Sequence, residues 1–297
     1  MNIRLQRFQL QPRRGLAFAG AIAAAGASLR SPALEASATQ IRWSLPHARF
    51  GQRFHPELPS GMRYCPNFIS RAEEQELDKL LEAGPWQFLA DARLRHIKSR
   101  AQQFFGLVYY QTSHELPALQ PNHPASQREA RPLQELPEWL MQRIVATGAF
   151  PREGEVNQVA ANEYLGATGI SSHVEEPTAF GANLGTLSLL APIEMTLMPA
   201  NQEIRSDGAD HGNWVKILLE PRSLLLLQGT SRYDFCHGIR RSRLVQLADG
   251  QIQRRGPGYR RVSLTFRELL PSRRQLPPAK TCKGCGKFIC MRRYRRC

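Results

Sequence analysis

Residues 156–198 read VNQVAANEYLGATGISSHVEEPTAFGANLGTLSLLAPIEMTLM, and this stretch decides the fold class. It holds three short β-prone runs separated by residues that favour turns, and three similar runs follow later in the chain. The six runs are Val156–Leu165, Leu184–Leu190, Ile193–Met198, Val215–Leu219, Ser223–Leu227 and Arg261–Phe266. Several short strands with turn residues between them are typical of an all-β sandwich or a jelly roll.

Two helices are predicted ahead of these strands. Ser70 is a preferred N-cap residue, and Glu73 completes a capping box before an apolar pattern that stops at Gly84. The second helix is expected over Leu136–Ala146, and the aromatic, β-prone segment Ile97–Tyr110 predicts a hairpin or an extended segment. Helices followed by strands predict an α+β fold, in which N-terminal helices buttress a jelly-roll core.

The net charge of +15 is concentrated at the two ends of the chain. Residues 1–34 contain five arginines and no acidic residue, and residues 273–297 contain nine Lys or Arg and no acidic residue, which leaves only +1 for residues 35–272. A basic tail can bind phosphate backbones, but charge-rich termini often serve only solubility. Charge alone therefore leaves nucleic-acid binding by the tail open.

The Arg-rich, acid-free residues 1–34 have the composition of an organelle transit peptide, so we expect a mitochondrial or other organellar location. A secretory signal and a dispensable extension of a cytoplasmic or nuclear protein are the alternatives. Residues 35–62 are interpreted as a linker or an edge packed on the domain, which is expected to span residues 63–272. No apolar run reaches the roughly 18–20 residues that cross a bilayer, so no stable membrane insertion is expected.

His173, Glu175 and His237 are the candidate metal ligands. In an extended chain, residues two apart point to the same side, so His173 and Glu175 can converge on one ion. Two imidazoles and one carboxylate leave three octahedral positions open, which is the facial triad of non-haem iron(II) oxygenases. Taken alone, a His-x-Glu motif is weak, because it is common by chance and a histidine near a strand end is often structural.

The segments around these ligands form an ordered series of motifs over roughly residues 60–270. The series consists of Asn162-Glu163-Tyr164, Gly166 and Gly169, His173-Val174-Glu175, Leu187-Ser188-Leu189, Arg222-Ser223-Leu224-Leu225, Arg232-Tyr233 with His237-Gly238-Ile239, and Arg261-Val262-Ser263-Leu264-Thr265-Phe266-Arg267. In order and spacing it resembles the signature of the AlkB family of 2-oxoglutarate dioxygenases.

The resemblance implies a double-stranded β-helix enzyme that uses Fe(II), 2-oxoglutarate and O2 and releases succinate and CO2. The iron would be held by His173, Glu175 and His237. This chain departs from the family at Glu175, where Asp is usual, and the extra methylene moves the carboxylate by about a bond length. We favour an active enzyme, while a catalytically weakened binding module, or Glu176 as the ligand, are the alternatives.

The resemblance also implies a set of co-substrate residues. Arg261, helped by Asn162 and Tyr164, would bind the far carboxylate of 2-oxoglutarate, and Arg267 would approach the keto-acid end. A guanidinium grips a carboxylate through two charge-assisted hydrogen bonds. Alternation places Arg261 and Arg267 on one face of the last strand. The alternative is an exposed pair of arginines on a strand.

The substrate stays open at this point, because relatives in the AlkB family act on bases in DNA or RNA, on the wobble uridine of tRNA, or on proteins. We favour nucleic acid, with a protein substrate such as methyl-lysine as the alternative. A modified base would be flipped out and stacked on aromatic side chains, for which Phe105, Tyr109 and Tyr110 are candidates. Arg93 and Arg95 are candidates for phosphate contacts. Core packing and a solvated surface are the alternative roles of these residues.

The four C-terminal cysteines are a candidate zinc site. Cys282, Cys285, Cys290 and Cys297 provide four thiolates within sixteen residues, and tetrahedral Zn2+ is the expected occupant. A comparable terminal zinc cluster accompanies the tRNA-modifying branch of the AlkB family, and this likeness favours RNA as the substrate. Unpaired thiols in a disordered tail are the alternative.

Overall fold

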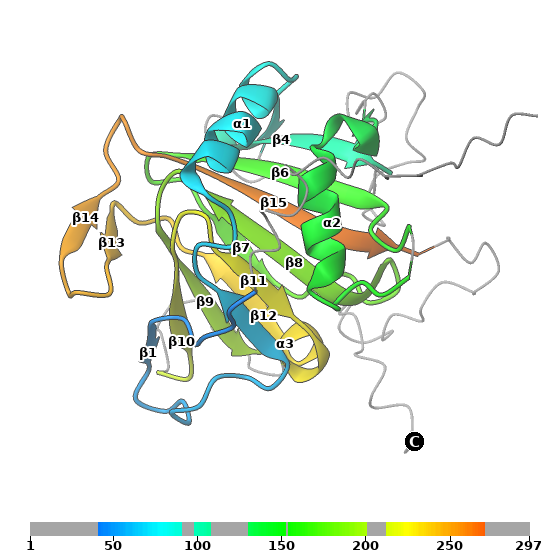
Figure 1. The fold of residues 1–297 in the computed structure, drawn as a ribbon. Helices are drawn as coiled ribbons and strands as arrows, with labels where there is room; N and C mark the ends of the chain where they lie inside the picture. The colour runs from blue at the N-terminus through cyan, green and yellow to red at the C-terminus, as the bar shows by residue number, and fades with distance from the viewer. Residues whose placement is uncertain (1–40, 91–97, 108–129, 153, 201–211, 271–297) are drawn as a thin grey trace, which may run out of the picture. The chain divides into compact units, whose positions relative to one another are not determined.

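The structure, a computed structural model, describes residues 41–90, 98–107, 130–152, 154–200 and 212–270 (Figure 1). Most strands of this part belong to two largely antiparallel sheets of eight and five strands. The order of the strands matches a double-stranded β-helix, so the predicted jelly-roll core with N-terminal helices is confirmed. All six β-prone runs of the sequence coincide with strands.

The larger sheet holds the strand that carries the predicted co-substrate arginines. Its order is β2 (Met62–Cys65), β11 (Leu224–Leu227), β8 (Phe180–Leu189), β15 (Arg260–Leu269), β6 (Gln158–Leu165), β4 (Lys98–Gly106) and β3 (Gln87–Ala90), and the short β5 (Ala130–Arg131) pairs with β4. The described part of the predicted segment Ile97–Tyr110 is a single strand, β4, so the extended alternative is the one observed, and β4 pairs antiparallel with β3. β15 lies between β6 and β8, so it occupies the middle of the sheet.

The smaller sheet holds both candidate histidine ligands. Its order is β1 (Ala48–Phe50), β10 (Val215–Leu219), β9 (Ile193–Pro199), β12 (Phe235–Ile239) and β7 (Ile170–His173). A separate hairpin, β13 (Leu244–Gln246) with β14 (Ile252–Arg254), projects from one end of the molecule (Figure 1). The pairing of β1 with β10 shows that the described part of residues 35–62 is an edge of the fold rather than a linker. The domain therefore begins before the predicted residue 63.

The two sheets pack against each other through apolar side chains. One hydrophobic cluster combines residues of the larger sheet, such as Leu225 and Leu227, with Leu197 and Ile217 of the smaller sheet. Burial of such side chains is the main favourable contribution to folding. The apolar side chains of this cluster thus join the two sheets, while polar side chains occupy other inner positions.

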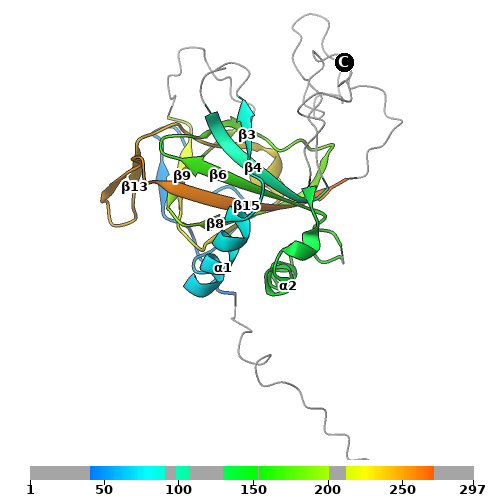
Figure 2. The same cartoon turned by 90° about the horizontal axis from the view of Figure 1, so that it is seen from above.

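Two helices cover the outer face of the larger sheet. α1 (Arg71–Glu82) and α2 (Glu138–Ala146), the latter preceded by the 3-10 turn η2 (Leu133–Glu135), lie on the same side of β8 and β15 (Figure 2). They bury their leucines against every second residue of β15, namely Val262, Leu264 and Phe266. The alternate residues of β15, including Arg261, therefore face the interior of the jelly roll. A short helix, α3 (Gly229–Tyr233), leads into β12. No helix of the described residues is long and apolar enough to cross a membrane.

The predicted capping box at the start of α1 is present and also joins the two helices. Ser70 Oγ accepts from the main-chain N–H of Glu73, and the Glu73 carboxylate accepts from the main-chain N–H of Ser70. Both Glu73 oxygens also accept from Arg143 of α2, at 2.7 and 2.9 Å. Burial by itself raises the pKa of Glu73, but the hydrogen bonds from Arg143 and Ser70 outweigh it and hold the pKa below its ordinary value.

Replacing Glu73 with Gln is expected to lower the free energy of unfolding by about 1–2 kcal/mol at pH 7. Because the folded-state pKa of Glu73 is depressed, its contribution is present above the ordinary carboxyl pKa and is lost as the pH falls through the folded value. The difference between wild type and Glu73→Gln in urea unfolding should therefore shrink as the pH falls from 7 to about 3. A difference that is independent of pH would contradict this assignment.

Candidate metal centre

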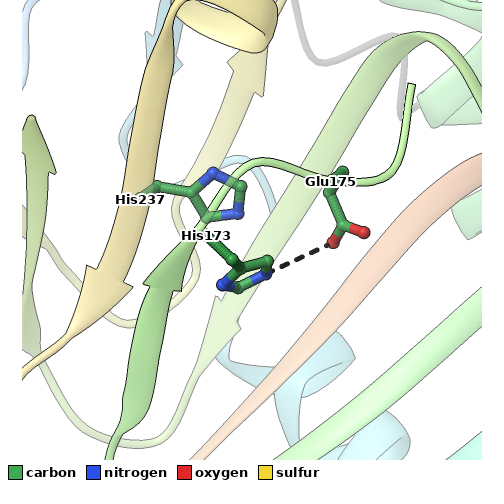
Figure 3. Close-up of side chains that lie close together, drawn as sticks. All are labelled: His173, Glu175 and His237. Carbon is green, nitrogen blue, oxygen red and sulfur yellow. Dashed lines mark ion pairs between the residues drawn. The ribbon is translucent and has the colours of Figure 1, made fainter. Parts of the chain in front are cut away.

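The three candidate ligands point toward one another from two neighbouring strands and the loop that follows (Figure 3). β12 pairs with β7 so that His237 lies directly opposite His173, and Glu175 follows two residues after the end of β7. Ligand atoms of the three side chains all lie within 4.8 Å of one another. The Nε2 atom of His173 lies 3.9 Å from Oε1 of Glu175. Neighbouring octahedral ligands are about 3 Å apart, so small side-chain movements bring these atoms to coordination distance.

A glycine beside His237 allows the two histidine strands to approach closely. A Cβ atom on Gly238 would lie 2.8 Å from the Cα of Ser172, which is too close for any side chain. The strands can therefore meet at this point only if the residue after His237 is glycine. As a result, the imidazole ring centroids of His173 and His237 lie 4.7 Å apart.

Both imidazoles are prepared to bind a metal. Nδ1 of His173 lies 2.8 Å from the main-chain oxygen of Ser171, which can only accept, so Nδ1 carries the proton and Nε2 keeps its lone pair. His237 is buried, and its buried Nδ1 has no hydrogen-bond partner in the described part of the chain. Burial, assisted by the neighbouring His173, lowers the pKa of His237 to about 4. His237 is therefore neutral at physiological pH, as a metal ligand must be.

Glu175 provides the carboxylate of the cluster, and its side chain is 13% exposed. Its two oxygens accept from Nη1 of Arg267 at 3.0 and 3.1 Å. Burial by itself raises the pKa of the Glu175 carboxyl, but Arg267 and the two histidines hold it well below its ordinary range. The carboxylate is thus ionised and ready to coordinate. The alternative ligand Glu176 is exposed, and its carboxylate accepts from the main chain and hydroxyl of Thr178 instead.

Arg261 is fully buried and faces the interior of the jelly roll. Its Nη2 donates to Ser188 Oγ at 2.9 Å, and its guanidinium lies 5.1 Å from the centre of the Tyr164 ring. Nε and Nη1 are buried and have no hydrogen-bond partner among the described residues. Burial lowers the pKa of this guanidinium, and a buried cation with free N–H groups needs an anion to offset its desolvation. The alternative of an exposed arginine pair is therefore wrong for Arg261.

The remaining predicted co-substrate residues lie on the same inner face. Asn162 is opposite Ser263 of β15 and accepts a 2.5 Å hydrogen bond from Gln102 of β4. Tyr164 is opposite Arg261 in the same pairing. Sequence reasoning missed Gln102, and no local pattern marks it, because its role depends on which strand pairs with β6.

One predicted substrate residue is corrected by the structure. Phe105 is fully buried on the outer face of the larger sheet, within the hydrophobic cluster that includes Leu136 and Leu140. The guanidinium of Arg131 lies 4.7 Å from the centre of its ring. Phe105 is therefore a core residue beneath the helices, and the proposed stacking on a substrate base is wrong for it.

The other substrate and zinc candidates lie outside the described residues. These are Arg93, Arg95, Tyr109, Tyr110, Cys282, Cys285, Cys290 and Cys297. Their roles therefore stay predictions from the sequence. Among the described residues, the cluster of His173, Glu175 and His237 is the group that can hold a metal ion.

The chemistry of the centre fits ferrous iron and a dicarboxylate. Two imidazole nitrogens and one carboxylate oxygen, without a thiolate, suit an octahedral iron that keeps several positions open. A buried guanidinium with unused donors suits the far carboxylate of a keto acid. Both groups face the interior of the jelly roll.

Comparison of the sequence with known proteins also indicates a site for iron and a keto acid. The family model described as the 2OG-Fe(II) oxygenase superfamily matches residues 61–267. The Bos taurus protein "Alpha-ketoglutarate-dependent dioxygenase alkB homolog 7, mitochondrial" is 28% identical over 219 residues, which cover 72% of this chain and 83% of the relative. The Danio rerio "Probable RNA/DNA demethylase ALKBH6" is 27% identical over 232 residues, which cover 72% of this chain and 87% of the relative.

A third relative is longer than the matched region. The Arabidopsis thaliana "Alkylated DNA repair protein ALKBH8 homolog" is 26% identical over 223 residues, which cover 70% of this chain. The match spans only 58% of that protein. This chain therefore corresponds to little more than half of the Arabidopsis relative.

Proposed function

We propose that this protein oxidises methylated or otherwise modified bases in RNA or DNA. The chain belongs to the 2OG-Fe(II) oxygenase superfamily and is an AlkB-like 2-oxoglutarate-dependent dioxygenase. The observation that carries the chemistry is the convergence of His173, Glu175 and His237 in the interior of the jelly roll, which the buried Arg261 of the opposite sheet also faces. The nucleic-acid substrate is supported by the names of two relatives, one an RNA/DNA demethylase and one an alkylated-DNA repair protein.

The residues of this chain would act by binding and orienting rather than by acid–base catalysis. His173, Glu175 and His237 would hold Fe(II) on one side and leave the other side to co-substrate and O2. Arg261, with Asn162 and Tyr164, would fix the far carboxylate of 2-oxoglutarate. Iron supplies the activation of O2, and the net reaction converts 2-oxoglutarate to succinate and CO2 while a substrate C–H becomes C–OH. On an N-methyl group, the hydroxymethyl product loses formaldehyde, which is a net demethylation.

Mass spectrometry of nucleosides tests the substrate class. Total tRNA and genomic DNA are incubated with the protein, Fe(II) and 2-oxoglutarate, digested and compared with reactions that lack 2-oxoglutarate. We expect at least one modified nucleoside to decrease only in the complete reaction. Succinate formation that requires an added protein substrate, and no nucleic acid, would favour the alternative of a protein substrate. A chain that forms no succinate with any substrate but binds RNA would be the weakened binding module.

The location of the protein and its zinc site are further proposals. The name of the Bos taurus relative includes the word mitochondrial, which supports an organellar location for this chain. Imaging of a fluorescent protein fused to residues 1–34 tests it, and a diffuse cytoplasmic signal would count against it. The zinc proposal rests on the four cysteines of the tail, and metal analysis of the protein with and without residues 273–297 tests it.

A further inference from the structure

Arg232 is a fully buried arginine in contact with the main chain of a candidate ligand. It lies in α3, five residues before His237, and no part of it is accessible. Its Nη1 donates to the main-chain oxygen of Glu175 at 2.8 Å. Nε and Nη2 are buried and have no hydrogen-bond partner in the part of the chain that the structure describes.

The position of this cation is costly for folding. A buried guanidinium is normally offset by a carboxylate, because its desolvation exceeds what a single neutral hydrogen bond returns. Here the nearby carboxylate of Glu175 is held by Arg267 through both oxygens. Burial accordingly lowers the pKa of Arg232, although the nearby Glu175 opposes the shift. The guanidinium also lies 4.8 Å from the centre of the Tyr233 ring, but neither this ring nor a single carbonyl offsets the burial of a charge, so the position of Arg232 calls for another role.

The contact connects the two segments that carry the metal ligands. α3 continues directly into β12, which carries His237, and the Glu175 carbonyl belongs to the loop after β7, which carries His173. The hydrogen bond from Arg232 therefore fixes the main chain at Glu175 relative to the strand of His237. The other restraints on this loop are the pairing of β7 with β12, which ends at His173, the side-chain contact of Glu175 with Arg267, and main-chain hydrogen bonds to Glu176. The bond from Arg232 is the one that ties the main chain of Glu175 itself to the segment of His237.

A fixed main chain at residue 175 determines how far the carboxylate of the third ligand can reach. The ligand atoms already lie within 4.8 Å of one another with the Glu175 side chain as it stands. An aspartate on the same main chain would withdraw the carboxylate by about 1.5 Å, the length of one C–C bond. We propose that Arg232 is a positioning residue that holds the Glu175 main chain, and with it the third ligand, at a fixed distance from His237. This inference rests on the proposed function, since it assumes that the three ligands bind a metal.

The test is a titration of the metal-free protein with Co(II), followed by the visible absorption of the complex, in a double-mutant cycle. The variants are Arg232→Met, Glu175→Asp and the double variant. Arg255→Met is the matched control, because Arg255 is also a buried arginine that donates to main-chain carbonyls, those of Thr168 and Arg240, and does not contact a ligand. Thermal unfolding of each metal-free protein is measured in parallel.

We expect Arg232→Met and Glu175→Asp each to raise the Co(II) dissociation constant at least about tenfold, the effect of losing a residue that orients a ligand. In the double variant, the increase in the Co(II) dissociation constant should be smaller than the product of the two single increases. Both substitutions change the same distance, that between the carboxylate of residue 175 and the metal. Arg255→Met should bind Co(II) like the wild type, even if the midpoints of unfolding of the two arginine variants shift equally. Arg232→Gln, whose amide is too short to reach the carbonyl, should repeat the loss if Arg232→Met does not fold.

Other outcomes overturn the inference. Co(II) affinity within twofold of the wild type in the Arg232 variants, or independent effects in the double variant, would show that Arg232 does not position Glu175. A loss in Arg255→Met equal to that in Arg232→Met would show that the effect follows general destabilisation. If the wild type itself failed to bind Co(II), this result would contradict the proposed function, and the inference about Arg232, which assumes metal binding, would be rejected with it.

Discussion

Replacing His237 with Ala is expected to reduce succinate formation from 2-oxoglutarate by at least about a thousandfold, since two ligands cannot hold iron in a catalytic geometry. His237 is buried and neutral, and its Nδ1 has no hydrogen-bond partner in the described structure, so the metal-free fold loses no hydrogen bond there. The midpoint of unfolding of the metal-free protein should therefore change much less than activity does. Succinate is measured by mass spectrometry at saturating Fe(II) and 2-oxoglutarate.

The matched control for this variant is His55→Ala. The His55 side chain is 77% exposed, and its ion-pair partner in the structure is Glu57 at 3.8 Å, so its removal should leave succinate formation within twofold of the wild type. A His237→Ala protein that kept more than a tenth of the activity would show that His237 is not an iron ligand. Loss of activity in both variants would indicate a general loss of folded protein instead.

The shared direction of the His173 and Glu175 side chains could be predicted because its signal is local, whereas His237 was joined to them by the resemblance to the AlkB family. His173 and Glu175 are two residues apart in an extended segment, and alternation alone places their side chains on one side. Arg261 could be assigned in the same way, since Val262, Leu264 and Phe266 mark the other face of its strand as core. In each case the period of two along one strand decides the direction of the side chain. No knowledge of the neighbouring strands is needed.

The residues that were missed or wrongly assigned depend on pairing between strands. β4 is polar and aromatic on both faces, so the sequence does not show that Gln102 faces inward and Phe105 outward. Only the register of β4 against β6, with Gln102 opposite Asn162, decides this. A shift of one residue would exchange the two faces. Arg232 is a similar case, because its contact with Glu175 joins segments 57 residues apart.

Replacing Arg261 with Met is expected to remove the preference of the protein for a keto acid with a second carboxylate. The wild type should bind 2-oxoglutarate more tightly than 2-oxopentanoate, which carries a methyl group in place of the far carboxylate. Loss of one partner of a buried, hydrogen-bonded charge pair costs about 2–5 kcal/mol, or about 30-fold or more in affinity. Calorimetric titration of the Co(II)-loaded protein with both acids measures the preference. In Arg261→Met, the two acids should bind with affinities within a few fold of each other.

Arg260→Met is the control, because it makes the same substitution at the adjacent residue, whose guanidinium lies on the opposite face of β15. Arg260 contacts Asp78 at 2.6 Å and Glu163 at 2.7 Å, which links α1 to the sheet rather than facing the interior. Arg260→Met should therefore lower the midpoint of unfolding and keep the preference for 2-oxoglutarate. Loss of the preference in Arg260→Met, or its survival in Arg261→Met, would place the far carboxylate elsewhere. Since the two arginines differ by one position in the alternation of a single strand, the comparison tests directly whether that alternation sets the co-substrate site.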